Sequence, residues 1–205
     1  MGRNHNPLHF ACNILPNSKG IRDMNKRAVI AIDIQNEYFP GGRMPLVGIQ
    51  QAAANAARVI DAARAKGDTV IHVRHLSKAA DAPIFAPGTA GIEINATVAP
   101  ADGEKVITKN YVNSFRDTDL KATLDAGGIE EVVIVGAMSH MCVEGATRAA
   151  ADFGYKTSVI HDACATRDLE FNGKTVPAAQ VHDAVMAAIA FGYGELVDTA
   201  TYLSR

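Results

Sequence analysis

Short apolar runs rich in β-branched residues alternate along the chain with longer alanine-rich stretches in which apolar residues recur every three or four positions. The first pattern predicts strands and the second predicts amphipathic helices. Their alternation from residue 27 onwards is typical of βαβ units, which build a mainly parallel sheet. We therefore expect six strands, at residues 28–33, 69–74, 105–109, 131–136, 157–161 and 195–197.

Four helices are expected between these strands. Glycine ends three of them, at Gly67, Gly127 and Gly154, because it tolerates the left-handed conformation that closes many helices. The last helix has Pro177 in its first turn, where a missing N–H removes no hydrogen bond. The expected helices span 49–66, 117–126, a third with Val143, Ala146, Ala150 and Phe153 on one face, and 176–191.

Two segments lack this alternation. Residues 1–26 form an N-terminal extension before the expected domain at 27–205. We interpret the extension as disordered, as a stretch preceding a natural start at Met24, or as an arm that contacts a neighbouring subunit. Cys12 lies in it, and we assign Cys12 no catalytic role. The connection over 76–100 is long and rich in proline, so we expect a flap over whatever site exists.

Composition narrows the class of protein. A chain of 205 residues suits one α/β domain with a full core. The 20 basic and 22 acidic side chains nearly balance, which argues against nucleic acid or a membrane surface as the partner and favours a small molecule. The three cysteines have no metal-like spacing, and no transmembrane-length run is present, so the cytoplasm is the expected compartment.

Chemically capable residues stand at the ends of three predicted strands. Asp33 ends the first strand, Lys109 ends the third, and Cys142 follows the fourth by one short loop. The carboxyl ends of parallel strands meet at one edge of the sheet, where ligands bind in open α/β folds. A thiolate is favoured by a nearby cation and by a helix N-terminus, so we expect Lys109 and the first turn of the third helix to activate Cys142. Asp33 is then suited to move the proton.

Each of these residues also has a simpler interpretation. A lone buried cysteine is more often a small hydrophobic side chain than a nucleophile. Asp33 could cap a loop, and Lys109 could be a solvated strand end. For each residue taken alone, the structural interpretation is favoured over a catalytic one. It is weaker for the three residues together, because they stand at three strand ends.

Three motifs resemble the isochorismatase-like cysteine hydrolases, a superfamily that includes nicotinamidase and N-carbamoylsarcosine amidase. They are AVIAIDIQNEYFPGG around Asp33, ITKNYVNSF around Lys109 and VVIVGAMSHMCVEGATRAAADFGY around Cys142. The resemblance implies a three-layer α/β/α Rossmann-like fold and an Asp33-Lys109-Cys142 triad that hydrolyses an amide through a cysteine-bound intermediate. It also implies a cis peptide bond between Ala137 and Met138, and an oxyanion hole formed by the N–H groups of Met138 and Cys142.

Differences between this sequence and particular members of the superfamily indicate whether a metal is expected and which reaction is favoured. The Asp-x-His metal motif of nicotinamidases has no match here. His72 and His75 lie on and just past the second predicted strand, three apart, so in an extended chain they point to opposite faces. We therefore expect no metal and no cofactor. Isochorismatases that cleave a vinyl ether need no thiol, so Cys142 favours C–N hydrolysis. Vinyl-ether hydrolysis and a non-catalytic ligand-binding role remain alternatives.

Side chains that flank the triad are expected to contact the substrate, and the family resemblance implies a homodimer or homotetramer. The substrate itself is not identified by the sequence, because pocket shape depends on the long loop and on any neighbouring subunit. The candidate substrate-binding residues are Tyr38, Phe39, Tyr111, Phe115, Met138, His140 and Phe171.

Overall fold

Six parallel strands form the central sheet of the computed structural model, which describes residues 26–205. The predicted extension at 1–26 therefore lies outside the described residues, apart from Lys26. The order β3-β2-β1-β4-β5-β8 confirms the predicted six-stranded, mainly parallel sheet. The strands are β1 (Arg27–Ile32), β2 (Thr69–His75), β3 (Lys105–Lys109), β4 (Glu131–Ala137), β5 (Lys156–Ala165) and β8 (Glu195–Val197).

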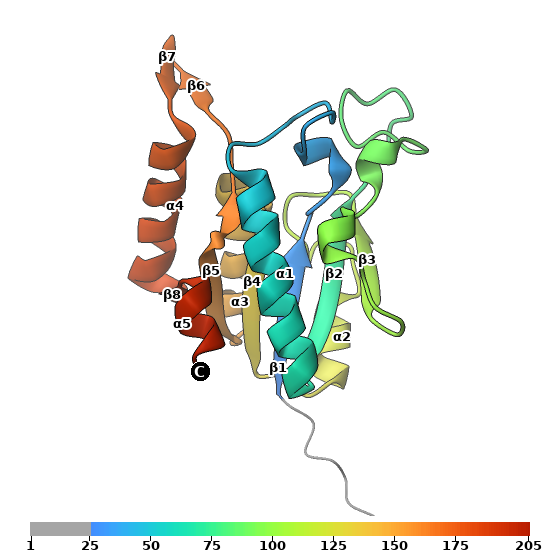
Figure 1. The fold of residues 1–205 in the computed structure, drawn as a ribbon, viewed down its shortest axis with the longest axis vertical. Coiled ribbons are helices and arrows are strands. Elements are labelled where there is room, and N and C mark those ends of the chain that lie inside the picture. Colours follow the sequence, from blue (N-terminus) through green and yellow to red (C-terminus); the bar gives the residue numbers. More distant parts are fainter. Residues whose placement is uncertain (1–25) are drawn as a thin grey trace, which may run out of the picture.

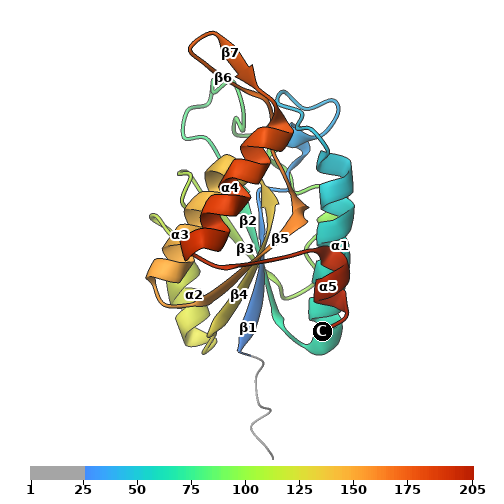
Figure 2. The same cartoon turned by 90° about the vertical axis from the view of Figure 1, so that its left-hand side faces the viewer.

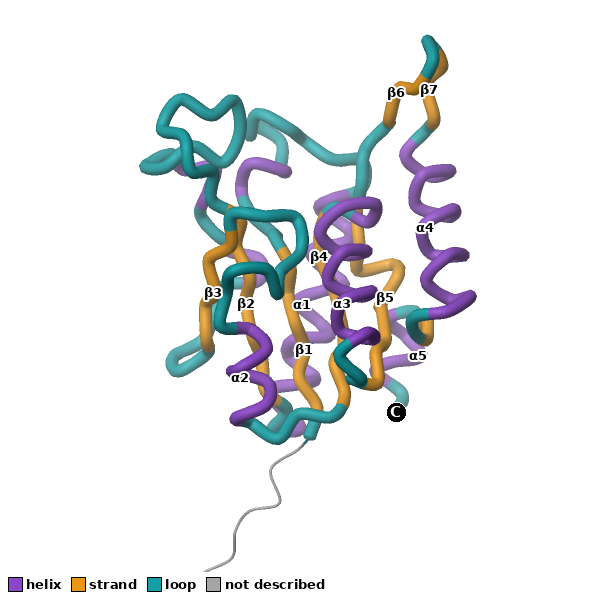
Figure 3. The backbone as a smooth tube through the Cα atoms, turned by 180° about the vertical axis from the view of Figure 1, so that it is seen from behind, coloured by secondary structure: helices purple, strands orange, loops and turns teal. Residues whose placement is uncertain are grey.

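Helices cover both faces of this sheet and complete the predicted three-layer α/β/α arrangement (Figures 1 and 2). In Figure 3, α2, α3 and α4 lie in front of the sheet, while α1 and α5 lie behind it. No helix among residues 26–205 is long and apolar enough to cross a membrane. The α-helices are α1 (Ile49–Lys66), α2 (Leu120–Ala126), α3 (Glu144–Asp152), α4 (Ala178–Gly192) and α5 (Thr199–Leu203).

Shorter elements gather around the carboxyl ends of the strands. The connections after β1 and β2 contain 3₁₀ turns, and the chain after β4 makes one π-helical turn before α3. An antiparallel hairpin projects beyond the sheet next to the start of α4 (Figure 1). These elements are η1 (Asn36–Tyr38), η2 (Ala90–Ile92), η3 (Ala96–Val98), η4 (Ser139–Val143), β6 (Leu169–Phe171) and β7 (Lys174–Val176).

The central strand β1 packs on both layers. Val29 and Ala31 contact the cluster beneath α1, and Ile30 and Ile32 contact the cluster beneath α2, α3 and α4. All four side chains are nearly or fully buried, as expected for a parallel sheet covered on both faces. Each buried valine or isoleucine stabilises the fold by about 1.5–3 kcal/mol. This packing makes the end of β1 a rigid support for the residue that follows it.

Several element boundaries differ from the predictions. α2 begins at Leu120 rather than at 117, because Asp117 adopts a left-handed φ of 54° that a helix does not contain. α4 begins at Ala178, with Pro177 as its N-cap, because residues 174–176 pair in the hairpin. The hairpin itself was not predicted, and β5 runs to Ala165, past an irregularity in its pairing with β4.

Strand order places a topological switch between β1 and β4. The chain runs outward from β1 through β2 to β3, then returns to the other side of β1 for β4. The connections of β1 and β4 thus leave in opposite directions and open a crevice at their carboxyl ends, the usual ligand site in such sheets. Asp33 follows β1 at this crevice, and Cys142 follows β4.

Candidate active site

Asp33 leaves the end of β1 in an unusual backbone conformation. Its φ is 51°, a left-handed value that aspartate tolerates better than most residues. Its N–H still donates to the Val73 carbonyl oxygen over 2.9 Å, so the strand pairing continues while the chain turns. The carboxylate is completely buried.

Lys109 brings a buried cation to this carboxylate. Its Nζ lies 2.7 Å from Asp33 Oδ2, with both side chains fully buried, and donates to Cys142 Sγ over 3.2 Å. A third acceptor, His75 Nδ1, lies 3.1 Å away. Burial lowers the pKa of Lys109, but Asp33 and then Cys142 more than offset it, so the pKa is raised and the side chain is an ammonium.

Cys142 lies in the π-helical turn η4, which precedes α3, rather than in the first turn of an α-helix as predicted. The expectation of an activated thiolate also needs correction. Burial raises the pKa of the thiol, Asp33 raises it further, and Lys109 only partly opposes them. This environment favours the protonated thiol over the thiolate, and the side chain is almost fully buried.

The three side chains are arranged for proton transfer. The Lys109 ammonium lies 2.7 Å from Asp33 Oδ2, whereas Asp33 Oδ1 has no hydrogen-bonding partner among the described residues. The carboxylate thus keeps lone pairs for a proton from the thiol or from a bound ligand. A carboxylate base, a thiol and a cation in contact with both can generate a nucleophile when it is needed.

The turn that carries Cys142 is held from two sides. The N–H groups of Met141 and Val143 both donate to the Met138 carbonyl oxygen. The fully buried Ser139 hydroxyl lies 2.8 Å from His182 Nδ1 on α4. The peptide bond between Ala137 and Met138 is cis. Sequence reasoning did not single out Ser139 or His182, since no pattern links a helix to this turn.

A groove of about 660 Å³ runs beside the same turn. The turn and its N-cap contribute Met138, His140 and Met141 to its lining, and the loop after β1 and the hairpin contribute Met44, Leu169, Glu170 and Thr175. His140 Nδ1 lies 2.6 Å from Thr166 Oγ1, which orients the ring. Of the predicted substrate contacts, Met138 and His140 line this groove.

The remaining predicted contact residues are distributed over different environments. Tyr38 and Phe39 are buried in the α1 layer, and the hydroxyl pKa of Tyr38 is raised by burial and then by the nearby Asp33 and Cys142. Tyr111 lies under the Arg116 guanidinium, 3.8 Å from ring centroid to Cζ. Phe115 packs against Phe153 and Tyr155. Phe171 is 73% exposed on the hairpin.

The two histidines of β2 have different partners. His72 Nε2 lies 3.0 Å from Glu104 Oε2, whereas His75 faces Lys109. They do not share a site, in agreement with their predicted opposite orientations. No group of three metal-ligating side chains occurs among the described residues.

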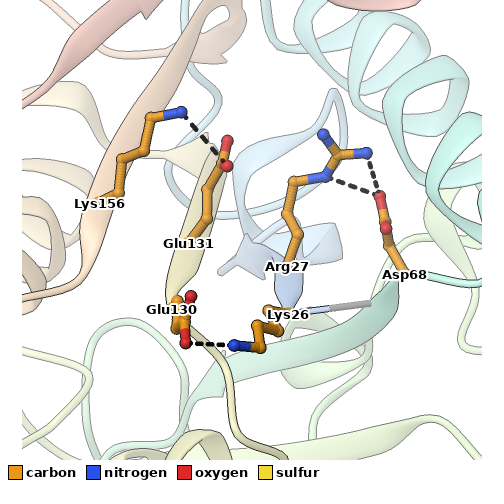
Figure 4. A pocket seen from close by; sticks show the side chains of 6 residues that line it. All are labelled: Lys26, Arg27, Asp68, Glu130, Glu131 and Lys156. Atoms are coloured by element: carbon orange, nitrogen blue, oxygen red, sulfur yellow. Dashed lines mark hydrogen bonds and ion pairs between the residues drawn. The ribbon is translucent and has the colours of Figure 1, made fainter. Parts of the chain in front are cut away.

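A second cavity, of about 410 Å³, lies at the opposite end of the strands. Figure 4 shows its charged side chains paired as Lys26 with Glu130, Arg27 with Asp68 and Lys156 with Glu131. These residues precede or begin β1, β2, β4 and β5, away from the strand ends where the triad lies. Their matched ion pairs connect neighbouring elements of the fold and leave no balance of charge for a ligand.

Comparison with known proteins identifies the family. The isochorismatase domain model matches residues 27–200. YddQ, an isochorismatase family protein of Bacillus subtilis (strain 168), is 43% identical over 176 residues, which cover 86% of this chain and 98% of YddQ. A crystal structure of a protein from Oleispira antarctica aligns with a TM-score of 0.86 and 48% identity, covering 91% of this chain and 100% of the other.

More distant relatives have named activities. Streptothricin hydrolase of Streptomyces noursei is 33% identical over 172 residues, covering 80% of this chain and 56% of that enzyme. N-carbamoylsarcosine amidase of Arthrobacter sp is 28% identical over 163 residues, covering 70% of this chain and 61% of that enzyme. With the family model matching most of its length and the sheet matching in three dimensions, this chain belongs to the isochorismatase family of hydrolases.

Proposed function

We propose that the protein is a cysteine amidohydrolase, which cleaves a C–N bond of a small amide or ureide through a covalent cysteine intermediate. One observation supports this most strongly: a buried lysine contacts both a carboxylate, at 2.7 Å, and a thiol, at 3.2 Å, at the switch point of the sheet. Here Asp33, Lys109 and Cys142 are the proposed catalytic residues.

In the first half-reaction, Asp33 takes the proton of the Cys142 thiol as the sulfur attacks the substrate carbonyl carbon. The raised pKa of the thiol makes such a base necessary, and Lys109 supports the thiolate as it forms. Asp33 then gives the proton to the leaving nitrogen, the C–N bond breaks, and ammonia or an amine departs. The acyl group remains on sulfur as a thioester.

The tetrahedral intermediate places a negative charge on the former carbonyl oxygen. We propose that the N–H groups of Met138 and Cys142 hold this oxygen, because backbone donors aimed at a developing oxyanion supply a large share of such catalysis. The Met141 and Val143 N–H groups are already committed to the Met138 carbonyl oxygen, so they are not candidates.

In the second half-reaction, water attacks the thioester carbon and Asp33 takes its proton. Collapse of the intermediate breaks the C–S bond, releases the carboxylic or carbamic acid and restores the thiol. Asp33 gives this proton back to the sulfur, so the same carboxylate acts twice as base and twice as acid. Its open lone pairs and its position beside both the sulfur and the cation support these roles.

The proposal that the cleaved bond is a C–N bond rests on the Cys142 thiol and on the named activities of similar proteins. A streptothricin hydrolase and an N-carbamoylsarcosine amidase are among the proteins similar to this chain. Vinyl-ether hydrolysis needs Asp33 but no thiol, so mutation of Cys142 distinguishes it from amide hydrolysis. We further propose that the protein acts in the cytoplasm. We also propose that it is a homodimer or homotetramer, and light scattering on the purified protein will test this oligomeric state.

The decisive experiment measures ammonia release from nicotinamide, N-carbamoyl amino acids, biuret and simple aliphatic amides. Wild type, Cys142→Ala and Cys164→Ala are compared with and without a chelator. Cys164 is the matched control, because it is also a buried thiol but donates to the Ile160 carbonyl oxygen. Release that Cys142→Ala abolishes and Cys164→Ala retains supports the proposal. Isochorismate turnover lost in Asp33→Ala but kept in Cys142→Ala would instead establish vinyl-ether hydrolysis.

A further inference from the structure

Among the described side chains that form a hydrogen bond or ion pair with the Lys109 ammonium, His75 is the one that the proposed reaction does not use. It is the last residue of β2, and it pairs in register with Lys109, the last residue of β3. Because β2 lies between β3 and β1, the Lys109 side chain must pass the end of β2 to reach Asp33. Its Nζ lies 3.1 Å from His75 Nδ1 along that path.

The chemistry of the contact settles which nitrogen carries the imidazole proton. An ammonium group has three N–H donors and no acceptor, and it is surrounded here by three acceptors: Asp33 Oδ2, Cys142 Sγ and His75 Nδ1. His75 Nδ1 must therefore be unprotonated, with the proton of the neutral ring on Nε2. A protonated Nδ1 would remove an acceptor and put a second cation against Lys109.

The position of the His75 ring is fixed independently of Lys109. The fully buried Gln35 accepts from the backbone N–H of His75 over 2.7 Å and donates to the His75 backbone carbonyl oxygen over 2.9 Å, which fixes the backbone that carries the ring. The Phe85 ring packs against the imidazole with centroids 5.2 Å apart. An acceptor held this firmly can orient a flexible lysine side chain.

We propose that His75 is a positioning residue: as a neutral imidazole it accepts a hydrogen bond from Lys109 and so holds the ammonium on Asp33 and Cys142. This inference rests on the proposed function. Without the Nδ1 acceptor, one N–H of a buried cation has no partner, which disfavours the charged form of Lys109. The support that Lys109 gives to the thiolate then weakens.

The charge environment of the ring fits a neutral imidazole. The charged groups that act on it are Lys109 on β3 and Asp33 after β1, whereas the loop side is covered by the uncharged Phe85. Burial lowers the pKa of His75, Lys109 lowers it further, and Asp33 opposes them. Both the burial and the neighbouring ammonium therefore favour the neutral ring.

The first test reads the proton position directly and needs no substrate. In protein labelled with ¹⁵N-histidine, long-range ¹H–¹⁵N spectra distinguish the two neutral tautomers and the charged ring, and His75→Asn identifies the His75 signals. We expect the Nε2–H tautomer at about pH 7. A proton on Nδ1 at that pH, in either the neutral or the charged ring, overturns the proposal.

The second test measures how fast iodoacetamide alkylates Cys142, followed on its own peptide by mass spectrometry. His75→Asn keeps an acceptor at the Nδ1 position, whereas His75→Leu has a similar size and none. We expect alkylation to slow about tenfold or more in His75→Leu, the loss of about one hydrogen bond to a charged group, and to stay near the wild-type rate in His75→Asn. His161→Asn, on β5 away from the triad, serves as the control.

Wild-type reactivity in His75→Leu overturns the proposal, provided that its thermal unfolding matches that of His75→Asn. If His75→Leu does not fold, the tautomer measured in the wild-type protein still tests the proposal. The result is separable from the proposed function, because alkylation reports on the thiol whether or not any amide is cleaved. Amide hydrolysis that persists in Cys142→Ala would refute the function, while wild-type alkylation in His75→Leu would refute only the role of His75.

Discussion

The Lys109 ammonium donates to the Cys142 sulfur over 3.2 Å, yet the thiol pKa lies above its ordinary value. Burial is the largest cause and the Asp33 carboxylate the next, and together they outweigh the cation. The resting site is therefore described better as a Cys142 thiol beside an Asp33 carboxylate base than as a Cys142 thiolate. Alkylation and turnover should then respond differently when Asp33 is changed.

Asp33→Asn should speed alkylation of Cys142 while abolishing amide hydrolysis. Replacing the carboxylate by a neutral amide removes an anion that raises the thiol pKa and leaves Lys109 to lower it, so more thiolate is present at neutral pH. Hydrolysis fails because no base accepts the thiol proton and no acid protonates the leaving nitrogen. The measurement is the alkylation rate between about pH 6 and 9, beside ammonia release.

Asp162→Asn is a suitable control for this experiment. Asp162 is also an acidic residue near the strand ends, but its carboxylate accepts from the N–H and hydroxyl of Thr199. It should leave the alkylation profile unchanged. Slower alkylation in Asp33→Asn would show that the carboxylate promotes the resting thiolate, contrary to the electrostatics described above.

Lys109→Met should destabilise the fold far more than Cys142→Ala. Removing the lysine charge leaves the Asp33 carboxylate fully buried without its ion-pair partner. Breaking a buried pair in this way costs about 3–5 kcal/mol, whereas removing one sulfur leaves both charges in place. Urea unfolding at neutral pH measures the difference. The double variant with Asp33→Asn should recover most of the loss, and failure to recover would mean that the lysine stem, not its charge, stabilises this region.

The proximity of Asp33, Lys109 and Cys142 could be predicted from the sequence, because each stands at or just after a strand end, where parallel topology brings them together. The role of His75 could not, because it depends on β2 lying between β3 and β1, and strand order is not written in the pattern of apolar residues. The π-helical turn around Cys142 is only five residues long, too short to show a repeat that separates it from the first turn of an α-helix. By contrast, Asn172-Gly173 is a standard hairpin signal, and the hairpin could have been found from it.

Gly136→Ala should disturb both stability and the site. Gly136 on β4 pairs with Ile32 and adopts a φ of 127°, and a Cβ there would lie 2.0 Å from the Ile32 carbonyl oxygen. The next residue after Ile32 is Asp33, so relief of this clash would move the Asp33 carboxylate away from Cys142. We expect a loss of about 1–3 kcal/mol or more in unfolding free energy, together with reduced turnover.

Gly154→Ala separates the effect of the clash with Ile32 from the effect of the left-handed backbone conformation. Its φ of 90° is also left-handed, but a Cβ there would meet nothing within 4 Å. It should therefore show only the backbone cost of about 1–2 kcal/mol, with turnover intact. Equal effects of the two variants on unfolding and turnover would mean that the contact with Ile32 has no consequence.

Glu104→Gln should remove part of the acid sensitivity of the fold. Arg64 on α1 donates to both Glu104 oxygens over 2.8 and 2.9 Å. These hydrogen bonds connect α1 to the residue that precedes the edge strand β3. Hydrogen bonds from Arg64, the largest cause, lower the pKa of Glu104 to about 2, even though burial opposes them. The ordinary value is 4.5, so the folded state binds this proton less readily than the unfolded chain does. The stabilisation is therefore complete above about pH 4.5 and is lost as the pH falls towards 2.

The difference in unfolding free energy between wild type and Glu104→Gln should be about 3 kcal/mol at neutral pH, as a pKa shift from 4.5 to about 2 implies. It should shrink steadily below about pH 4.5, because protonation gives the wild type a neutral side chain as well. Glu130→Gln is the control, since Glu130 pairs with Lys26 at the surface, where an ion pair contributes about 0–1 kcal/mol. A difference that stays constant from neutral pH into the acid range would mean that Glu104 stabilises the fold by its packing and not by its charge.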